Sequence, residues 1–266
     1  MNVQNYIYEG SVVFTVTTNG YKFLTWNLWL HVKKLNVPWT LLILCLDKES
    51  HKFFQQIAMI PSVLVPDVQL SLLGDSTKVS QYGTGDFNRI TRQKLQTFTT
   101  LLGMPSLTTV LYLDSDIVLF RDPLSEIRGR LSEETPLWFQ CDEHNESFTC
   151  SSENQGDICH NCCTGVIGFW LGSTPRRQEM LRLVHYEDEI WKQCKQNNDQ
   201  EYIQKRLSHY ETAFSILPRT LYPNGAFLRE NKFQSLEAPV LLHFNFLVGG
   251  NKQRVIKSKG FWLVPY

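Results

Sequence analysis

Apolar runs alternate with amphipathic segments through the first half of the chain. Continuous apolar or β-branched stretches, which predict buried strands, cover residues 11–17, 39–46, 61–65 and 108–113. Between them, apolar residues recur at helical spacing, which predicts helices over residues 21–35, 48–59 and 88–102. Fully apolar strands that alternate with helices are typical of a parallel sheet covered on both faces. The pattern therefore predicts an α/β fold.

The second half of the chain is less regular. Its apolar runs predict further strands over residues 137–141, 165–171, 212–217 and 239–243. Helical spacing predicts helices over residues 175–194 and 199–207. Because no internal repeat, low-complexity tract or linker divides the sequence, we expect one domain over residues 1–266.

Two aspartates interrupt the apolar residues after the fourth predicted strand. Asp114 and Asp116 follow the run 108–113, and a second apolar run, 117–120, comes directly after them. Two buried carboxylates are costly unless a positive group lies between them. Oxygen ligands one residue apart suit Mn²⁺ or Mg²⁺, which commonly keeps open positions for substrate phosphates. The pattern therefore indicates a metal-assisted enzyme that acts on a phosphorylated donor.

Composition and charge exclude several classes of protein. The chain has 26 basic and 26 acidic residues, so no net field attracts nucleic acid or an anionic membrane. No basic run is longer than two residues, which disfavours nucleic-acid binding. Residues 1–5 lack the pattern of a signal peptide, and no segment reaches the roughly 18 apolar residues of a transmembrane helix. We therefore expect a soluble cytoplasmic protein with no transmembrane segment and no nucleic-acid partner.

Seven cysteines allow more than one interpretation. Cys45 lies in an apolar run and is expected to be buried, while the other six fall between Cys141 and Cys194. The pair Cys159 and Cys162 has the spacing of a zinc knuckle, but no second pair follows at a standard distance. Zinc, a disulfide and free thiols all remain open. The odd number and the lack of a signal peptide favour free thiols.

The segment around the aspartates, Leu111-Tyr-Leu-Asp-Ser-Asp-Ile-Val-Leu-Phe-Arg-Asp-Pro123, resembles the Asp-x-Asp core of nucleotide-diphospho-sugar transferases of the GT-A fold. The resemblance covers most of the chain through spaced motifs, and small soluble viral and bacterial members have a similar length. It implies a Rossmann-like α/β/α sandwich with a mainly parallel central sheet. Residues 1–123 would form the nucleotide-sugar-binding half, and residues 124–266 the acceptor and catalytic half.

The resemblance also implies a metal site for the donor. Asp114 and Asp116 would bind Mn²⁺ or Mg²⁺ together with a late histidine, for which His243 stands at the expected place. Two carboxylates and an imidazole suit Mn²⁺. After His243, Gly249 would let backbone amides approach the diphosphate, and Lys252 would supply a positive charge. A hydrogen-bonded core histidine is the alternative for His243 alone.

Further donor contacts are expected before and after the aspartates. In the family the first strand-to-helix turn binds the nucleoside, and a basic residue and a Thr-Gly pair contact the sugar or the phosphates. The corresponding residues here, with the serine between the aspartates, are Thr17, Thr18, Asn19, Arg92, Lys94, Ser115, Thr164 and Gly165. Residues two apart on a helix do not share a face, so only one of the two basic residues is expected to point inward. Cys163 stands where relatives have asparagine.

The segment Asn198-Asp-Gln-Glu201 resembles the element that lies near the anomeric carbon in the family. Asp199 is the expected catalytic carboxylate, with Gln200 beside it, although a helix N-terminal charge is the plainer alternative for Asp199. The segment 217–225 resembles one that shapes the acceptor side. The resemblance favours retention of anomeric configuration without deciding it.

The predicted function is therefore metal-dependent transfer of a sugar, a hexose or a pentose, from a nucleotide-diphosphate sugar. The donor is expected to be UDP-linked, and the acceptor to be a hydroxyl of a glycan or glycoprotein. Two alternatives remain, a non-catalytic sugar-nucleotide or carbohydrate-binding relative and a metal-dependent sugar-nucleotide hydrolase. Hydrolases prefer several carboxylates around two metals, whereas only one acidic pair is evident here.

Overall fold

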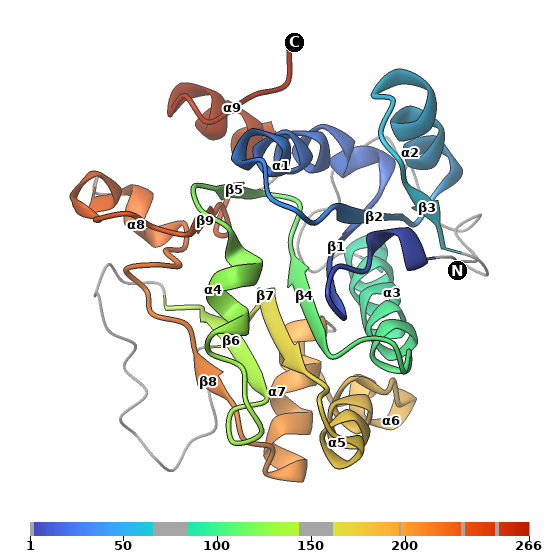
Figure 1. The fold of residues 1–266 in the computed structure, drawn as a ribbon. Coiled ribbons are helices and arrows are strands. Elements are labelled where there is room, and N and C mark those ends of the chain that lie inside the picture. Colours follow the sequence, from blue (N-terminus) through green and yellow to red (C-terminus); the bar gives the residue numbers. More distant parts are fainter. Residues whose placement is uncertain are drawn as a thin grey trace.

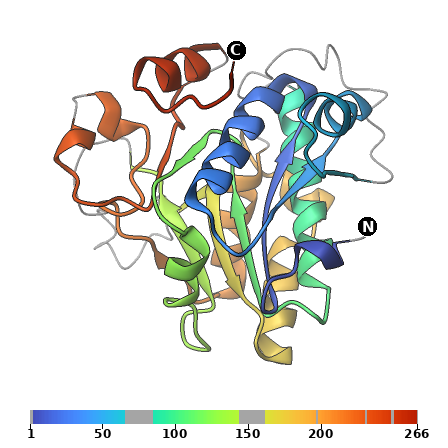
Figure 2. The same cartoon turned by 45° about the horizontal axis from the view of Figure 1, so that its top comes forward.

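The chain folds around one large twisted sheet with helices on both sides (Figures 1 and 2). The structure, a computed structural model, describes residues 3–65, 85–143, 162–196, 198–229, 232–247 and 250–265. The sheet has seven strands in the order β3-β2-β1-β4-β7-β6-β8. In that order their bounds are Val63–Leu64, Leu41–Cys45, Ser11–Thr17, Thr109–Leu113, Cys162–Trp170, Leu137–Cys141 and Ser215–Ile216.

Most of the strand pairs are parallel, as the sequence predicts. β3, β2, β1 and β4 run parallel to one another, and β6 pairs parallel with β8. β7 alone runs antiparallel to both of its neighbours, β4 and β6. β4 is an interior strand, between β1 and β7. The aspartates follow it directly, so they lie at the carboxyl end of the parallel strands, where open α/β sheets bind ligands.

The two faces of the sheet are covered by different helices. One face packs against α3 (Gly85–Leu102), α5 (Thr174–Val184) and α7 (Asp199–Tyr210). The other packs against α1 (Lys22–Leu35), α4 (Pro123–Arg128) and the π-helical turn that follows α2 (Lys48–Lys52). Alternation along the strands divides the apolar residues between these two cores, so that Phe14 faces one layer and Val13 the other. The expected α/β/α sandwich is confirmed.

A two-stranded ribbon lies beside the main sheet. β5 (Ile117–Leu119) pairs antiparallel with β9 (Leu241–His243), and the next helix is α9 (Gly250–Ser258). A small core that includes Leu24, Val118 and Phe244 joins this ribbon to α1 and α9. The ribbon therefore brings a late segment of the chain next to the residues that follow β4.

The structure corrects the predicted elements in several places. The single helix expected over residues 175–194 is broken into α5 and α6 (Asp188–Lys192). After α2 the chain continues as a short π-helical turn, η3 (Phe53–Ile57). Other short elements are η1 (Gln4–Tyr6), η2 (Asn19–Tyr21), α8 (Ala226–Arg229) and η5 (Lys232–Ser235). The strands expected over residues 61–65 and 212–217 shrink to the two-residue β3 and β8 because they pair at opposite edges of the sheet.

The cysteines are not all in one state. Free thiols, all buried, are found at Cys45, Cys162, Cys163 and Cys194. Cys141 is disulfide-bonded, so the prediction of free thiols is wrong for this residue. Cys159, of the suggested zinc pair, lies outside the described residues.

Within the part of the chain that the structure describes, none of the helices combines the length and the apolar character that a bilayer crossing requires.

A half-buried guanidinium fixes the turn between α3 and β4. Arg177 of α5 donates hydrogen bonds to the carbonyl oxygens of Leu102 (2.8 Å), Met104 (2.7 Å), Leu107 (2.5 Å) and Leu171 (3.4 Å). Two of these carbonyls belong to the segment that leads directly into β4. Since the end of an α-helix leaves its last carbonyls without helical partners, Arg177 supplies donors that the backbone lacks there.

Replacing this guanidinium should weaken the whole fold. We expect Arg177→Met to lower the free energy of unfolding by about 3 kcal/mol, because several buried carbonyls lose a charged donor. The matched control Arg182→Met changes an exposed arginine of the same helix and should cost less than about 0.5 kcal/mol. Urea unfolding followed by circular dichroism measures both. Equal losses for the two variants would contradict this role.

Candidate active site

The chain turns sharply between Asp114 and Asp116. β4 ends at Leu113, and the backbone N–H of Asp114 donates to the carbonyl oxygen of Gly165 on β7 at 2.8 Å. β5 then leaves the main sheet and pairs with β9, with Ile117 opposite His243. The two apolar runs that flank the aspartates therefore belong to different sheets. This separation is what places His243 next to both carboxylates.

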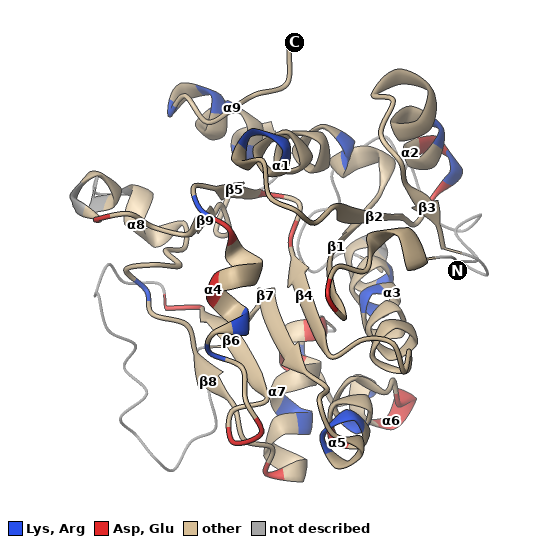
Figure 3. Cartoon of the chain, in the orientation of Figure 1, with Lys and Arg blue, Asp and Glu red and all other residues tan. Residues whose placement is uncertain are grey.

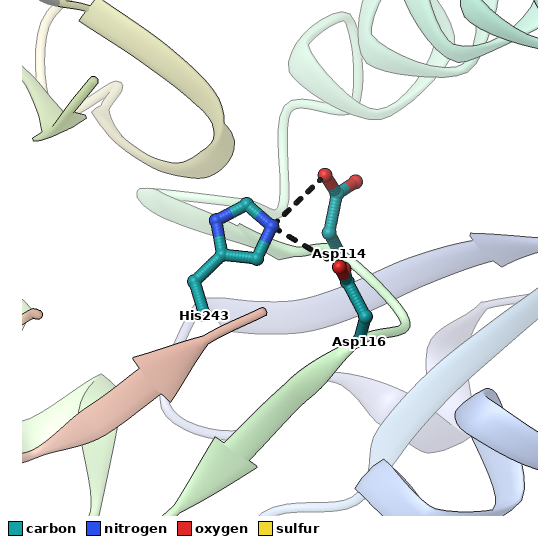
Figure 4. A group of neighbouring side chains, drawn as sticks. All are labelled: Asp114, Asp116 and His243. Atoms are coloured by element: carbon teal, nitrogen blue, oxygen red, sulfur yellow. Dashed lines mark ion pairs between the residues drawn. The ribbon is translucent and has the colours of Figure 1, made fainter. Parts of the chain in front are cut away.

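Asp114, Asp116 and His243 form one cluster (Figure 4). Nε2 of His243 lies 3.2 Å from Oδ1 of Asp116 and 3.6 Å from Oδ2 of Asp114. One ligand atom from each residue lies within 4.8 Å of the other two. The structure thus brings together the three residues that the sequence predicts as metal ligands.

This donor set fits a hard divalent cation. Two carboxylate oxygens and one imidazole nitrogen are ligands that Mn²⁺ accepts, and they converge from elements that hold them in place. The ammonium group of Lys252 also lies at the cluster, with its Nζ 2.6 Å from Oδ2 of Asp116. Burial alone would raise the pKa of Asp116, but Lys252 and His243 outweigh it and hold the pKa well below its usual range. Asp116 is therefore an anion that positive charge stabilises.

Lys94 is the second cation of the site and is buried. Its Nζ lies 2.8 Å from Oδ2 of Asp199 and 3.5 Å from Oδ1 of Asp114, and it donates to the carbonyl oxygen of Thr164 at 2.8 Å. Burial alone would lower the pKa of Lys94, but the two carboxylates raise it above its usual value. Lys94 therefore stays charged and ties α3, β4, β7 and α7 together at one point.

A tyrosine orients the first aspartate. The hydroxyl of Tyr112 donates to Oδ1 of Asp114 at 2.5 Å, and Nζ of Lys94 lies 4.1 Å from the centre of the Tyr112 ring. Burial, and then the charge of Asp114, raises the pKa of Tyr112 well above its usual value. The hydroxyl therefore remains a donor and leaves Oδ2 of Asp114 to face His243.

Asp199 and Gln200 open helix α7. The side chain of Asn198 caps the helix by accepting from the backbone N–H of Glu201 at 2.8 Å. Asp199 lies in the first turn, where the helix dipole favours an anion, and it pairs with Lys94. Gln200 donates to Oδ2 of Asp142, which follows β6, at 2.7 Å. Both the helix N-terminus and the ion pair with Lys94 stabilise the negative charge of Asp199. A helix N-terminal charge, the plainer alternative, therefore explains only one of these two interactions.

These residues line one cavity of about 670 Å³ at the carboxyl end of the sheet. Both halves of the chain contribute to it. Of the predicted site residues, it contains Thr17, Thr18, Lys94, Asp114, Ser115, Asp116, Thr164, Gly165, Asp199, Gln200, His243 and Lys252. A volume of this size is typical of small-molecule sites.

Two predicted residues, Arg92 and Asn19, lie elsewhere. The guanidinium of Arg92 stacks on the ring of Tyr186 at 4.0 Å and lies 3.6 Å from Asp188, away from the cavity. Asn19 is held within its turn, since its side chain accepts from Lys22 at 2.8 Å. Gly249 lies outside the described residues. Of the basic pair on α3, Lys94 alone points inward, as the helical spacing requires.

The sequence reasoning missed several residues that complete the site. Asp142 and Asn245 line the cavity, and Nδ2 of Asn245 donates to Oδ1 of Asp142 at 3.2 Å. Gln140 accepts a hydrogen bond from Nδ1 of His243 at 2.7 Å. Tyr112, which orients Asp114, was missed as well. A signal was available for Tyr112 and Gln140, because Tyr112 lies two residues before Asp114 and Gln140 interrupts an apolar strand. Asn245 carried no comparable signal.

Cys163, which replaces the asparagine of the resemblance, lies behind the cluster. Its Sγ is 3.8 Å from Nδ1 of His243 and accepts from the backbone N–H of Gly165 at 3.4 Å. Burial and then the nearby Asp142 raise the pKa of this thiol well above its usual value, so it remains protonated.

Two aromatic residues follow His243 closely in the sequence. Phe246 lines the cavity, whereas Phe244 is fully buried in the core.

Gly165 is required by close packing against the cluster. A Cβ atom at this position would lie 2.1 Å from Cε1 of His243 and 2.8 Å from Oδ2 of Asp114. Any side chain would therefore push apart two of the three candidate ligands. Gly165, predicted to approach the sugar, therefore also leaves the space that the imidazole of His243 occupies.

Comparison with known protein families gives one extended match. A sequence model described as nucleotide-diphospho-sugar transferase matches residues 39–255, most of the chain. The comparison with curated proteins finds no match.

Solved structures with the same fold are glycosyltransferases. The bifunctional glycosyltransferase WbbM superposes with a TM-score of 0.58 at 13% identity, over 91% of this chain and 47% of that one. The galactosyltransferase LgtC, in complex with donor and acceptor sugar analogues, gives 0.58 at 12%, over 96% and 97% of the chains. Mouse xyloside xylosyltransferase 1 gives 0.54 at 11%, over 88% and 97%. The chain thus spans about half of the WbbM chain and matches the fold of all three.

Removing the buried ammonium should destabilise the metal-free protein. We expect Lys94→Met to lower the free energy of unfolding by about 3 kcal/mol, because Asp199 and Asp114 lose their shared cation. Arg92→Met, two residues away on the same helix, removes an exposed ion pair and the contact with the Tyr186 ring, and should cost about 1 kcal/mol. Urea unfolding in the presence of a chelator compares the two. A larger loss for Arg92→Met would contradict the assignment.

Adding a methyl group at position 165 should damage the cluster. We expect Gly165→Ala to weaken Mn²⁺ binding by about 10-fold or more, because the new Cβ displaces His243 or Asp114. Gly85→Ala is the matched control, since no described heavy atom lies within 4 Å of its added Cβ. Electron paramagnetic resonance titration of free Mn²⁺ measures both affinities. Unchanged Mn²⁺ affinity in a folded Gly165→Ala protein would show that the metal does not use these ligands.

Proposed function

The chain belongs to the nucleotide-diphospho-sugar transferase family and is a glycosyltransferase with a nucleotide-sugar donor, and on that premise we propose a more specific reaction. The donor is a UDP-sugar bound through Mn²⁺, and the acceptor is a hydroxyl of a glycan or glycoprotein. The transferred sugar is a hexose or a pentose, as in the galactosyltransferase and the xylosyltransferase that share the fold. Retention of anomeric configuration is the stereochemistry that the resemblance favours.

One observation carries the proposal. Three candidate metal ligands, the buried Lys94 and the half-buried Lys252 converge on a single cavity that also contains the carboxylate of Asp199. Lys252 lies beside the three candidate ligands, where it would meet a diphosphate, and Lys94 lies between Asp114 and Asp199, the carboxylate that α7 contributes to the same cavity. A site for a neutral ligand would not require so many compensated charges.

The donor's diphosphate would meet Lys252 and the cluster of Asp114, Asp116 and His243. A bound Mn²⁺ would supply Lewis acidity toward the leaving diphosphate. Lys252, whose Nζ is 2.6 Å from Asp116, would add a preorganised positive charge at the same place. Thr17 and Thr18 follow β1 at the same end of the sheet, where they would contact the nucleoside.

The transfer itself breaks the bond between the anomeric carbon and a diphosphate oxygen and forms a bond from that carbon to the acceptor oxygen. In the retaining route, the acceptor proton passes to the leaving diphosphate oxygen. Asp199 would stabilise the positive charge that develops on the sugar, with Gln200 orienting the sugar beside it. Its ion pair with Lys94 at 2.8 Å makes the carboxylate a weaker nucleophile, which favours this electrostatic task over direct attack.

A panel of sugar nucleotides tests the proposal. We expect one UDP-sugar to bind in calorimetry with Mn²⁺ present, and Asp116→Asn to reduce its affinity by about 100-fold, because the loaded metal loses a buried ligand. The control Glu189→Gln alters a carboxylate whose side chain is 82% exposed, and should bind the donor as the unaltered protein does.

Release of UDP should then depend on a glycan acceptor. Equal UDP release with and without acceptor would indicate a sugar-nucleotide hydrolase, and binding without any turnover would indicate a non-catalytic relative. If no sugar nucleotide binds in the presence of Mn²⁺, the proposed donor site is wrong.

A further inference from the structure

Gln140 lies behind the imidazole of His243, and its orientation is fixed by the backbone around it. It is a fully buried polar residue in the otherwise apolar strand β6. Its Nε2 donates to the carbonyl oxygens of Tyr222 at 3.0 Å and Pro223 at 3.1 Å. Carbonyl oxygens only accept hydrogen bonds, so the atom that faces them must be the amide nitrogen. The amide oxygen of Gln140 is then the atom that faces His243.

This orientation determines where His243 carries a proton. Oε1 of Gln140 lies 2.7 Å from Nδ1 of His243. An amide oxygen cannot donate, and an unprotonated Nδ1 would place two acceptors in contact, so Nδ1 must carry the hydrogen. Figure 4 shows the opposite ring nitrogen, Nε2, facing both carboxylates. When the ring carries a single proton, Nε2 is therefore the nitrogen with a lone pair to offer a metal ion.

We propose that Gln140 is a positioning residue that holds the proton of His243 on Nδ1 and thereby reserves Nε2 for the metal ion. The inference rests on the metal site of the proposed function and adds a residue that touches neither metal nor sugar in that scheme. Outer partners of this kind commonly fix the tautomer and the ring orientation of a histidine ligand.

The assignment matters because the cluster contains a competing arrangement. Oδ1 of Asp116 is 3.2 Å from Nε2, close enough to accept a hydrogen bond from an Nε2–H group. A histidine with its single proton on Nε2 would bind Asp116 and block the place of the metal. Sγ of Cys163, 3.8 Å from Nδ1, is a weaker partner than an amide oxygen and would not prevent this. By holding the proton on Nδ1, Gln140 therefore keeps Nε2 free of a hydrogen bond to Asp116 and open to a metal ion.

The strand geometry aims Gln140 at His243. The pairing of β6 with β7 shifts in register between Phe139 and Gln140, so that Gln140 lies opposite Cys163. Such irregularities re-aim side chains near functional sites. The same amide holds the carbonyls of Tyr222 and Pro223, and Pro223 also accepts from the backbone N–H of His243 at 3.1 Å. Gln140 thus joins the predicted acceptor-side segment to a metal ligand.

Nuclear magnetic resonance of the metal-free protein tests the tautomer directly. Ring ¹⁵N shifts of His243, assigned with a His243→Gln variant and measured at alkaline pH where the ring is neutral, distinguish Nδ1–H from Nε2–H. We expect the proton on Nδ1. A bare Nδ1 with the proton on Nε2 would overturn the inference, and it would leave the proposed donor site untouched.

Two substitutions then separate hydrogen bonding from packing. Gln140→Met keeps the length of the side chain but removes the acceptor, so we expect the proton to move to Nε2 and Mn²⁺ affinity to fall about 10- to 100-fold. Gln140→Glu keeps an acceptor toward Nδ1 and should retain the Nδ1 proton and bind Mn²⁺ more tightly than Gln140→Met. Circular dichroism checks that both variants are folded, and electron paramagnetic resonance measures Mn²⁺ binding.

The outcomes distinguish the two proposals. A folded Gln140→Met protein with an Nδ1 proton and unchanged Mn²⁺ affinity would overturn the role of Gln140. If the unaltered protein shows the Nδ1 proton but binds no Mn²⁺, the metal of the proposed function is wrong while the tautomer assignment stands. If Gln140→Met does not fold, the spectrum of the unaltered protein together with Gln140→Glu still decides the assignment.

Discussion

The site depends on the compensation of buried carboxylates at the end of an apolar sheet. Asp116 and Asp199 are almost fully buried, and each is paired with an ammonium group, Asp116 with Lys252 at 2.6 Å and Asp199 with Lys94 at 2.8 Å. Without these cations the carboxylates would face a large desolvation cost. Figure 3 shows the strands of the sheet almost free of charged residues, with acidic ones at the turn between β4 and β5. The charges are therefore concentrated where a ligand can use them.

The fold supplies each compensating group from a different part of the chain. Lys94 comes from a helix on one face of the sheet, and Lys252 comes from the helix that follows the β5–β9 ribbon. The antiparallel β7 passes Gly165 close to the imidazole of His243, where a side chain would collide. Moving any of these elements would leave a buried charge without its partner, so the electrostatics of the site restrict how the sheet and the helices can pack.

Local signals in the sequence predicted the elements and the chemistry better than the contacts. Apolar runs located β1, β2 and β4, and helical spacing required that only one of Arg92 and Lys94 point inward. The spacing could not say which one, because that depends on Tyr186, before α6, and Asp188, at its start, which hold Arg92. The break between α5 and α6 was also missed, since the amphipathic pattern continues through it. Nothing local indicated that residues 140, 163 and 243 would meet, because such contacts depend on strand order and register.

The identity of residue 140 follows from demands on both of its sides. Toward His243 the site needs an acceptor, and toward Tyr222 and Pro223 it needs a donor of two hydrogen bonds. A carboxylate would meet the first demand and fail the second, and it would add an anion to a region that already contains Asp114, Asp116 and Asp142. A methionine would meet neither. A glutamine satisfies both demands without a charge, so a residue that can orient His243 leaves the balance between the carboxylates and the two lysines undisturbed.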